Sequence, residues 1–410
     1  MSNTPKYSIL IPTRNSIDYL KDCINSVIQQ KYINYELIIS DNHSDDGTYD
    51  YVKSLNHSNI SLIKPQEPLA MVDHWEWLLK HAKGDWVIFL GSDDGLMPYF
   101  FEVSDYLVAR ANKKNIKAIN SSRAYFFWEG CQKTYGNTNI SYSAVSSFRI
   151  KNTKLEILNA TIGLINYIDL PQMYTTSIVH KSIIKKTREK NLGYFYSDIN
   201  PDANGAANIC SSEKKYIESL VPLGWVGSSI KSNGLLYGLD REKYIRENTI
   251  NPKPIFIKWN QQAGLFNKHL HNLKIYLFEA LLQTRHLQTH IWEKIYSSKI
   301  FKIILFANVY SEIKNKEPEK TICLKETLTI NNISFGTVRI VEKVWKYIKR
   351  IVRKIQRLAE KLNAKTLVKK INFKMEYPSD SALRLMDAYK HIDKLAVESG
   401  FIKEFIRDFS

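Results

Sequence analysis

Apolar and polar positions follow two alternating patterns over the first hundred residues. Short apolar runs rich in β-branched and aromatic side chains indicate strands at 7–12, 35–41, 60–64 and 85–91. Between these runs, apolar residues recur at the spacing of an amphipathic helix, over 16–30, 44–55 and 71–82. Strands that alternate with helices predict βαβ units and a mainly parallel sheet with helices on both faces. The pattern therefore predicts an α/β fold.

The turns that follow the predicted strands matter most, because open sheets of this kind bind ligands at the carboxyl ends of their strands. These turns read "TRN" after Pro12, "DNHSDDGT" after Ser40 and "GSDDG" after Leu90. All three are polar and two are acidic. None is a G-x-G-x-x-G turn, and the chain has no G-x-x-x-x-G-K-[ST] loop, so dinucleotide and P-loop sites are weakly supported.

Two carboxylates, Asp93 and Asp94, stand side by side in the third turn. Such neighbours repel each other unless a positive charge lies close to them. Mg²⁺ and Mn²⁺ prefer carboxylate oxygens and are usually held by one or two of them plus substrate phosphates. The alternative is a solvated turn that caps a helix. The two residues alone leave both interpretations open.

Length and composition indicate a globular protein of more than one domain. The chain has 410 residues, which predicts two or three domains, and 44% hydrophobic residues, which suffices for a sizeable core. Its dispersed cysteines argue against a zinc site or a disulfide scaffold and favour a reducing compartment. The N-terminus lacks a secretory pattern, and the longest apolar runs are about half a bilayer span. We therefore expect a cytoplasmic protein.

Positive charge is concentrated near the C-terminus. Of the net charge of +17, +10 lies between Arg339 and Lys370, where twelve Lys or Arg accompany two Glu. The same segment, 339–370, has apolar residues at helical spacing, namely Val341, Val344, Ile348, Ile351, Ile355, Leu358 and Leu362. This amphipathic helix could dock on the protein's own helices, lie on an anionic membrane surface, or pair with another subunit. Because no nucleic-acid motif accompanies the charge, we expect no nucleic-acid partner.

Three segments together resemble a known family. "YSILIPTRNSIDYLKDCINSVIQQ", "YELIISDNHSDDGTYDYV" and "AKGDWVIFLGSDDGLMP" are similar, in order and spacing, to the nucleotide-binding half of family 2 glycosyltransferases with the GT-A fold. The resemblance implies a Rossmann-like GT-A sheet with flanking helices, followed by a helical C-terminal region. It assigns 1–112 to the nucleotide-sugar-binding half, 113–250 to the acceptor-binding half and 251–410 to a helical, basic region.

The resemblance also implies the nucleotide and metal site. The loop of Pro12, Thr13, Arg14 and Asn15 lines the nucleotide pocket, and Asp41 accepts a hydrogen bond from uracil. Asp93 lies near the ribose, and Asp94, with Asp93, binds the Mn²⁺ or Mg²⁺ ion that bridges the diphosphate. Two departures stand out. Gly91 replaces the first acid of a D-x-D-D pattern, and His74 stands where relatives usually have Asn. His74 or its neighbour Asp73 contacts the nucleotide, or His74 is structural.

The general base is expected in the acceptor half. "YSDINPDANGAANI" at 196–209 resembles the acceptor-site motif of a polysaccharide-building subset, which assigns the base to Asp202, with Asp198 as the competitor. The alternative for Asp202 is a helix N-terminal acid. Lys231, in "SSIKSNG", either contacts the diphosphate or is solvated. His180 more often packs in place than binds a metal.

These residues predict an inverting glycosyltransferase of polysaccharide biosynthesis. It moves a sugar from a nucleotide-diphosphate donor, expected to be a UDP-sugar, to a hydroxyl of a glycan or a lipid-linked glycan. A peripheral position on the inner face of the membrane would follow if 339–370 binds lipid. Two alternatives are a catalytically silent sugar-nucleotide-binding scaffold, and a sugar nucleotidyltransferase, which usually has a Gly-rich first loop.

Overall fold

The computed structural model describes residues 4–198, 200–232, 272–363, 370–376 and 383–407. Its larger sheet has eight strands among these residues, in the order β3-β2-β1-β4-β10-β6-β11-β9. The strands are β1 (Tyr7–Thr13), β2 (Tyr35–Asp41), β3 (Ile60–Ile63), β4 (Trp86–Phe89), β6 (Ala118–Ser121), β9 (Phe148–Asn152), β10 (Ser177–His180) and β11 (Lys215–Ser219). The first four run parallel to one another.

A second sheet of five strands has the order β13-β8-β7-β12-β5. Its strands are β5 (Gly95–Leu96), β7 (Ala124–Phe127), β8 (Thr138–Val145), β12 (Gly224–Ser228) and β13 (Lys370–Glu376). The helices up to residue 212 are α1 (Ile17–Ile28), α2 (Thr48–Ser54), α3 (Met71–Leu79), α4 (Phe100–Lys113), α5 (Gln132–Tyr135), α6 (Thr153–Thr161), α7 (Lys181–Lys190) and α8 (Pro201–Ser212).

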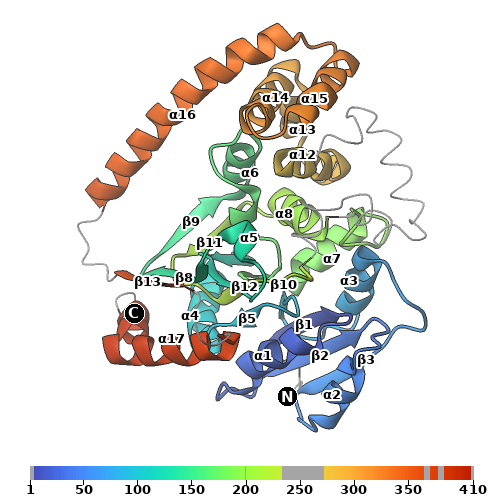
Figure 1. Cartoon of the computed structure of the whole chain (residues 1–410), viewed down its shortest axis with the longest axis vertical. Helices are drawn as coiled ribbons and strands as arrows, with labels where there is room; N and C mark the ends of the chain where they lie inside the picture. The colour runs from blue at the N-terminus through green and yellow to red at the C-terminus, as the bar shows by residue number, and fades with distance from the viewer. Residues whose placement is uncertain (1–3, 199, 233–271, 364–369, 377–382, 408–410) are drawn as a thin grey trace.

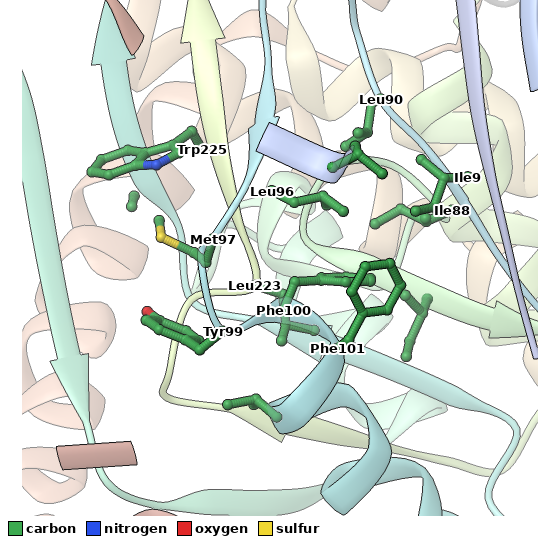
Figure 2. Close-up of a cluster of buried hydrophobic side chains, with 14 of the residues drawn as sticks. Ile9, Ile88, Leu90, Leu96, Met97, Tyr99, Phe100, Phe101, Leu223 and Trp225 are labelled. Carbon is green, nitrogen blue, oxygen red and sulfur yellow. The ribbon is translucent and has the colours of Figure 1, made fainter. Parts of the chain in front are cut away.

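The α/β architecture expected from the alternating pattern is confirmed, with one addition in the acceptor half. There β10 runs antiparallel to both β4 and β6, and β9 runs antiparallel to β11. β1 is almost wholly buried, which is why its sequence is a continuous apolar run instead of an alternating one. The main core lies between the two sheets and α4, where Leu96, Met97 and Trp225 meet Ile88 and Leu90 (Figure 2).

The C-terminal region is helical, as expected. It contains α12 (Leu273–Gln283), α13 (His290–Ser297), α14 (Lys299–Ile313), α15 (Pro318–Ile330), α16 (Phe335–Asn363), α17 (Leu385–Ser399) and α18 (Phe401–Arg407). α12 and α14 share a second core with α6 and α8 of the acceptor half (Figure 1). Within the described part of the chain, no helix is both long and apolar enough to cross a membrane.

The last segment of the chain returns to the N-terminal half. β13 pairs antiparallel with β8, and Leu385, Phe401 and Phe405 are fully buried in the main core. The Arg384 guanidinium donates to both oxygens of Asp22 in α1, at 3.1 and 3.0 Å. The described residues from 370 onward therefore pack away from the other C-terminal helices: β13 pairs with β8 of the expected acceptor half, whereas α17 and α18 contact α1 and α4 of the expected nucleotide half. The expected boundary at 250 lies outside the described residues.

Candidate functional site

The ends of β1 and β2 place two partnerless buried oxygens side by side. Thr13 and Asp41 are opposite each other in the strand register and are 3% and 0% exposed. Thr13 Oγ1 and Asp41 Oδ1 have no hydrogen-bond partner within the described chain, whereas Asp41 Oδ2 accepts from the Ser44 amide at 3.2 Å. A buried acceptor without a donor is costly, and such atoms are uncommon in native proteins. A ligand that supplies a donor at this strand edge would satisfy both oxygens.

The loop after β1 is tied to the loop after β2. The Asn15 amide donates to Ser44 Oγ at 2.9 Å, and Asn15 Oδ1 accepts from the Asp45 amide at 2.9 Å. Asn15 has a positive φ of 51°, a conformation that Asn tolerates better than most residues. Arg14 is exposed at the rim, and Pro12 is half-buried within the strand. The two polar turns picked out in the sequence thus form one continuous rim.

Asp94 is buried where three chain segments meet. It is 1% exposed and accepts from the Gly91 amide at 2.9 Å and the Gly227 amide at 2.7 Å. The hydroxyls of Thr175 and Tyr174 donate to it as well. These four donors match the roughly four acceptor directions of a carboxylate and hold three chain segments together. The metal-binding role expected for Asp94 stays a prediction.

Asp93 is the acid of the pair that remains accessible. It is half-buried, and its Oδ2 accepts from Ser229 Oγ at 2.8 Å and from Ser232 Oγ. Its carbonyl oxygen accepts from the Trp128 indole at 2.9 Å. Burial raises the pKa of Asp93, and burial followed by the charge of Asp93 raises the pKa of Asp94 to about 7. Burial and mutual repulsion thus disfavour the charged forms of the two acids, and a positive charge close to them would stabilise those forms.

Two glycines make room for the acidic turn. A Cβ on Gly227 would lie 1.7 Å from the Asp93 carbonyl oxygen, so β12 can approach only as glycine. A Cβ on Gly91 would lie 2.6 Å from the Tyr174 hydroxyl and 2.8 Å from Asp94 Oδ2. Tyr174 therefore occupies the space that a first acid of a D-x-D-D pattern would need. This contact explains physically why the chain has glycine at position 91.

The loop after β12 connects the acidic turn to the nucleotide rim. Ser229 and Ser232 bind Asp93, and between them Lys231 extends its ammonium to the Asn15 carbonyl oxygen at 2.8 Å. Lys231 is exposed. The loop therefore brings a cation to the same edge as Thr13 and Asp93, where the sequence suggested a diphosphate contact.

His74 lies beneath the rim. It is 4% exposed, and its Nε2 is 2.6 Å from Ser40 Oγ, one residue before Asp41. Burial lowers the pKa of His74 to about 4, so the ring is neutral near pH 7. This packing favours the structural alternative for His74. His180 is structural too: its Nδ1 accepts from the Ser182 amide at 3.2 Å and caps α7.

The two candidate bases flank the start of α8. Asp202 follows Pro201 in the first helical turn, a position favoured for both residues. The Tyr167 hydroxyl donates to Asp202 Oδ2 at 2.8 Å, and Asp202 is half-buried. Asp198 is 6% exposed, accepts from the Asn200 amide at 2.9 Å, and burial raises its pKa to about 6. Asp202 is thus the more accessible of the two carboxylates.

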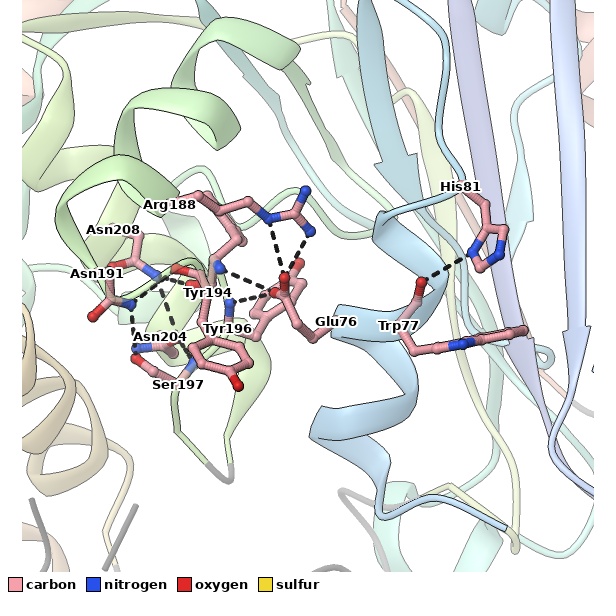
Figure 3. Close-up of polar contacts among 11 residues, drawn as sticks. Glu76, Trp77, His81, Arg188, Asn191, Tyr194, Tyr196, Ser197, Asn204 and Asn208 are labelled. Carbon is pink, nitrogen blue, oxygen red and sulfur yellow. Dashed lines mark hydrogen bonds and ion pairs between the residues drawn. The ribbon is translucent and has the colours of Figure 1, made fainter. Parts of the chain in front are cut away.

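A buried polar network fixes the segment before α8 (Figure 3). Glu76 of α3 accepts from the Phe195 and Tyr196 amides at 3.0 and 2.9 Å, and from Arg188 of α7 at 2.6 Å. Asn204 of α8 accepts from the Ser197 amide at 2.9 Å. The network connects the nucleotide half to the helix that carries Asp202, so the two sets of site residues belong to one packed unit.

A short segment between 172 and 175 joins the two halves a second time. The Gln172 carbonyl oxygen would lie 2.6 Å from a Cβ on Gly205 of α8, while Thr175 donates to Asp94. Met173 and Thr175 both have positive φ, at 60° and 41°, although neither is glycine. Strained backbone of this kind persists where surrounding contacts hold it and often occurs at functional sites.

Sequence reasoning missed several residues that shape the site. They are Glu76, Tyr174, Thr175, Ser229 and Ser232. The serines stand in "SSIKSNG", where attention went to the lysine alone. Nothing in the local pattern marks the others, because their partners lie 80 or more positions away along the chain, as Thr175 and Asp94 show at a separation of 81.

Residues 8–170 match the family model described as Glycosyl transferase family 2. That span covers the described strands β1 to β9 and stops before α8. The match confirms the resemblance seen in the first hundred residues, over a span that is less than half of the chain.

Relatives agree over part of their length. A protein of Escherichia coli, UDP-Glc:alpha-D-GlcNAc-diphosphoundecaprenol beta-1,3-glucosyltransferase WfgD, is 27% identical over 177 residues, which are 42% of this chain and 65% of WfgD. TuaG of Bacillus subtilis (strain 168), named for teichuronic acid biosynthesis, is 33% identical over 92 residues, 22% of this chain and 36% of TuaG. The matches thus span less than two thirds of these relatives.

Among solved structures, TarS 1–349 of S. aureus in complex with UDP-GlcNAc aligns with a TM-score of 0.42 and 15% identity. The alignment covers 83% of this chain and 92% of that chain. A likeness at this level does not support a shared donor or activity.

Proposed function

We propose that the protein is an inverting glycosyltransferase that uses a nucleotide-diphosphate sugar, with a UDP-sugar as the donor. The observation that carries the proposal is the pair of buried, partnerless oxygens of Thr13 and Asp41 beside the acidic turn. Asp41 Oδ1 can accept only, which matches the N–H of a uracil ring. The acceptor we propose is a hydroxyl of a glycan or lipid-linked glycan in polysaccharide biosynthesis, supported by the names of WfgD and TuaG.

The site offers few protein ligands to a divalent cation. Within the described residues no group of three or more His, Cys, Asp or Glu side chains could hold a metal ion. Asp93 alone would contribute a carboxylate, and Mg²⁺ or Mn²⁺ often binds through one carboxylate, water and substrate phosphates. The cation would offset negative charge on the diphosphate. Lys231 and Arg14 supply positive charge of the protein's own at the same rim.

The transfer itself needs a base on the acceptor side. We propose that Asp202 takes the proton of the acceptor hydroxyl while that oxygen bonds to the anomeric carbon and the bond to the diphosphate oxygen breaks. The nucleoside diphosphate leaves from the opposite face, which inverts the anomeric centre. The hydrogen bond from Tyr167 orients the carboxylate, and Oδ1 accepts from the Ala203 amide at 2.9 Å. Proton transfer by a positioned carboxylate typically contributes 10²- to 10⁴-fold.

Two variants test the base. Asp202→Asn is expected to lower kcat for transfer from a radiolabelled UDP-sugar into a bacterial lipid extract by roughly a hundredfold or more, with UDP affinity unchanged. Asp198→Asn serves as the matched control and should lower kcat far less. Full transfer by Asp202→Asn would rule Asp202 out. UDP binding without transfer by the wild type to any acceptor would favour the scaffold alternative.

A further inference from the structure

α16 has two separate apolar faces, only one of which is used within the protein. Its inner face lies on α14 and α6: Val338 is fully buried, the Trp345 indole donates to the Ile162 carbonyl at 2.9 Å, and Lys349 donates to Asn308 at 2.7 Å. Glu342 is 4% exposed and forms an ion pair with Lys314 at 3.0 Å. The helix therefore has a defined docking face, as the first of the three sequence alternatives suggested.

The opposite side carries an apolar stripe that the protein leaves uncovered. Its six side chains are 43% to 67% exposed: Ile340, Val344, Tyr347, Ile351, Ile355 and Leu358. At 3.6 residues per turn they fall within a sector of about 80°. Figure 1 shows the second half of α16 standing clear of the rest of the described chain. The apolar residues that the sequence grouped on one face therefore lie on two faces of α16. Val341 packs against the inner core, whereas Val344 is exposed to solvent.

A basic flank adjoins this stripe. It consists of six exposed residues, Arg339, Lys343, Lys346, Arg350, Arg353 and Lys354. They occupy the neighbouring sector of about 100° on the helix. From 335 to 355 the only acid is Glu342, on the inner face. Within the described chain none of the six forms a salt bridge. An apolar stripe beside an unneutralised row of cations is the pattern of a helix that lies in a membrane interface.

We propose that the outer face of α16 binds an anionic membrane surface, with the stripe in the acyl boundary and the basic flank on lipid phosphates. Long Lys and Arg side chains can bury their stems while their charges stay at the headgroups. Near an anionic surface each such charge strengthens binding by electrostatic attraction. Pairing with a second copy would instead bring like charges together, and a nucleic acid would leave the apolar stripe in water.

Vesicle flotation of the full-length chain tests this proposal. The wild type is expected to float with vesicles of phosphatidylcholine and phosphatidylglycerol, to stay behind with pure phosphatidylcholine, and to dissociate as salt rises. The stripe variant should bind at least tenfold less and carries Ile340→Gln, Val344→Gln, Ile351→Gln and Ile355→Gln. The flank variant should lose at least as much and carries Lys343→Gln, Lys346→Gln, Arg350→Gln and Lys354→Gln.

A control variant removes the same number of charges from elsewhere. It carries four substitutions of exposed lysines, Lys113→Gln, Lys114→Gln, Lys133→Gln and Lys190→Gln. It should float like the wild type, because net charge alone is not the cause. Equal flotation of all four proteins would overturn the proposal, as would no flotation of the wild type. So would a dimer in light scattering that only the stripe variant abolishes, since the face would then be a subunit contact.

Discussion

Single residues at the sheet edge differ in how far their oxygens are satisfied by donors of the chain itself. Asp41 and Thr13 have buried oxygens without donors, while Asp94 has every acceptor direction filled. The sequence could mark all three as candidates, because their position after strands is a local property. It could not distinguish their roles, since these depend on partners such as Thr175 and Gly227 from distant segments.

Burial of His74 predicts how the free energy of unfolding depends on pH. Its folded-state pKa of about 4 lies below the ordinary value of 6.5, so the folded protein favours the neutral ring. That contribution is fully present above pH 6.5 and is lost as pH falls toward 4; the difference corresponds to about 3 kcal/mol. In His74→Asn, the free energy of unfolding from urea curves should therefore fall less between pH 7 and pH 4 than it does in the wild type.

His81, exposed just beyond α3, supplies the control. His81→Asn should keep the wild-type dependence on pH. If His74→Asn also kept it, the buried contact with Ser40 would not be a neutral-ring contact, and the structural role given to His74 would be wrong.

At the scale of elements, the acidic turn depends on how closely β12 approaches it. Gly227→Ala should lower the free energy of unfolding by about 1–3 kcal/mol, because its Cβ would collide with the Asp93 carbonyl. It should also weaken UDP binding, since the turn must shift. Thermal unfolding and calorimetry measure the two effects.

Gly336→Ala is the matched control for this substitution. Gly336 lies near the start of α16, where the nearest atom to an added Cβ is Ser334 Oγ at 3.4 Å, an ordinary contact. Alanine in a helix should leave stability unchanged or raise it slightly. A Gly227→Ala protein as stable as the Gly336→Ala protein would mean that β12 is free to move away from the turn.

Elements of the nucleotide half were predictable because each is a strong local pattern. The strands at 7–12 and 35–41 and the one helix between them, at 16–30, appear within a residue or two as β1, β2 and α1. The antiparallel β10 was not predictable, because strand direction depends on crossover path and not on composition. α16 was predicted as a helix, but its division into two faces follows from α14, which a sequence pattern cannot place.

At the scale of the whole molecule, the C-terminal segment packs against the N-terminal part of the chain. β13, α17 and α18 pack into the core formed by the first 230 residues, although more than a hundred residues separate them. The shift to a Lys-rich, helical sequence pattern located the C-terminal helical region. It could not show that the final segment packs outside that region.

Truncation tests this packing. A chain ending at residue 363 lacks β13, α17 and α18 and would expose the partners of Leu385, Phe401 and Phe405. It should lose its cooperative thermal transition, because burial of large apolar side chains contributes about 1.5–3 kcal/mol each. A chain ending at residue 407 should melt like the full-length protein. A chain of 1–363 that melts within a few degrees of the full length would show that the return segment is dispensable.

The most direct test is calorimetric titration of UDP, GDP, CDP and dTDP, with and without Mn²⁺, into the wild type and three variants. We expect UDP to bind the wild type and Asp45→Asn, whose side chain is exposed on the same rim. Asp41→Asn should bind UDP at least tenfold more weakly, since a buried acceptor is partly replaced by a donor. Asp93→Asn should fold but lose the effect of Mn²⁺. Unchanged UDP affinity in Asp41→Asn, or no binding of any nucleotide by the wild type, would contradict a nucleotide site at this edge.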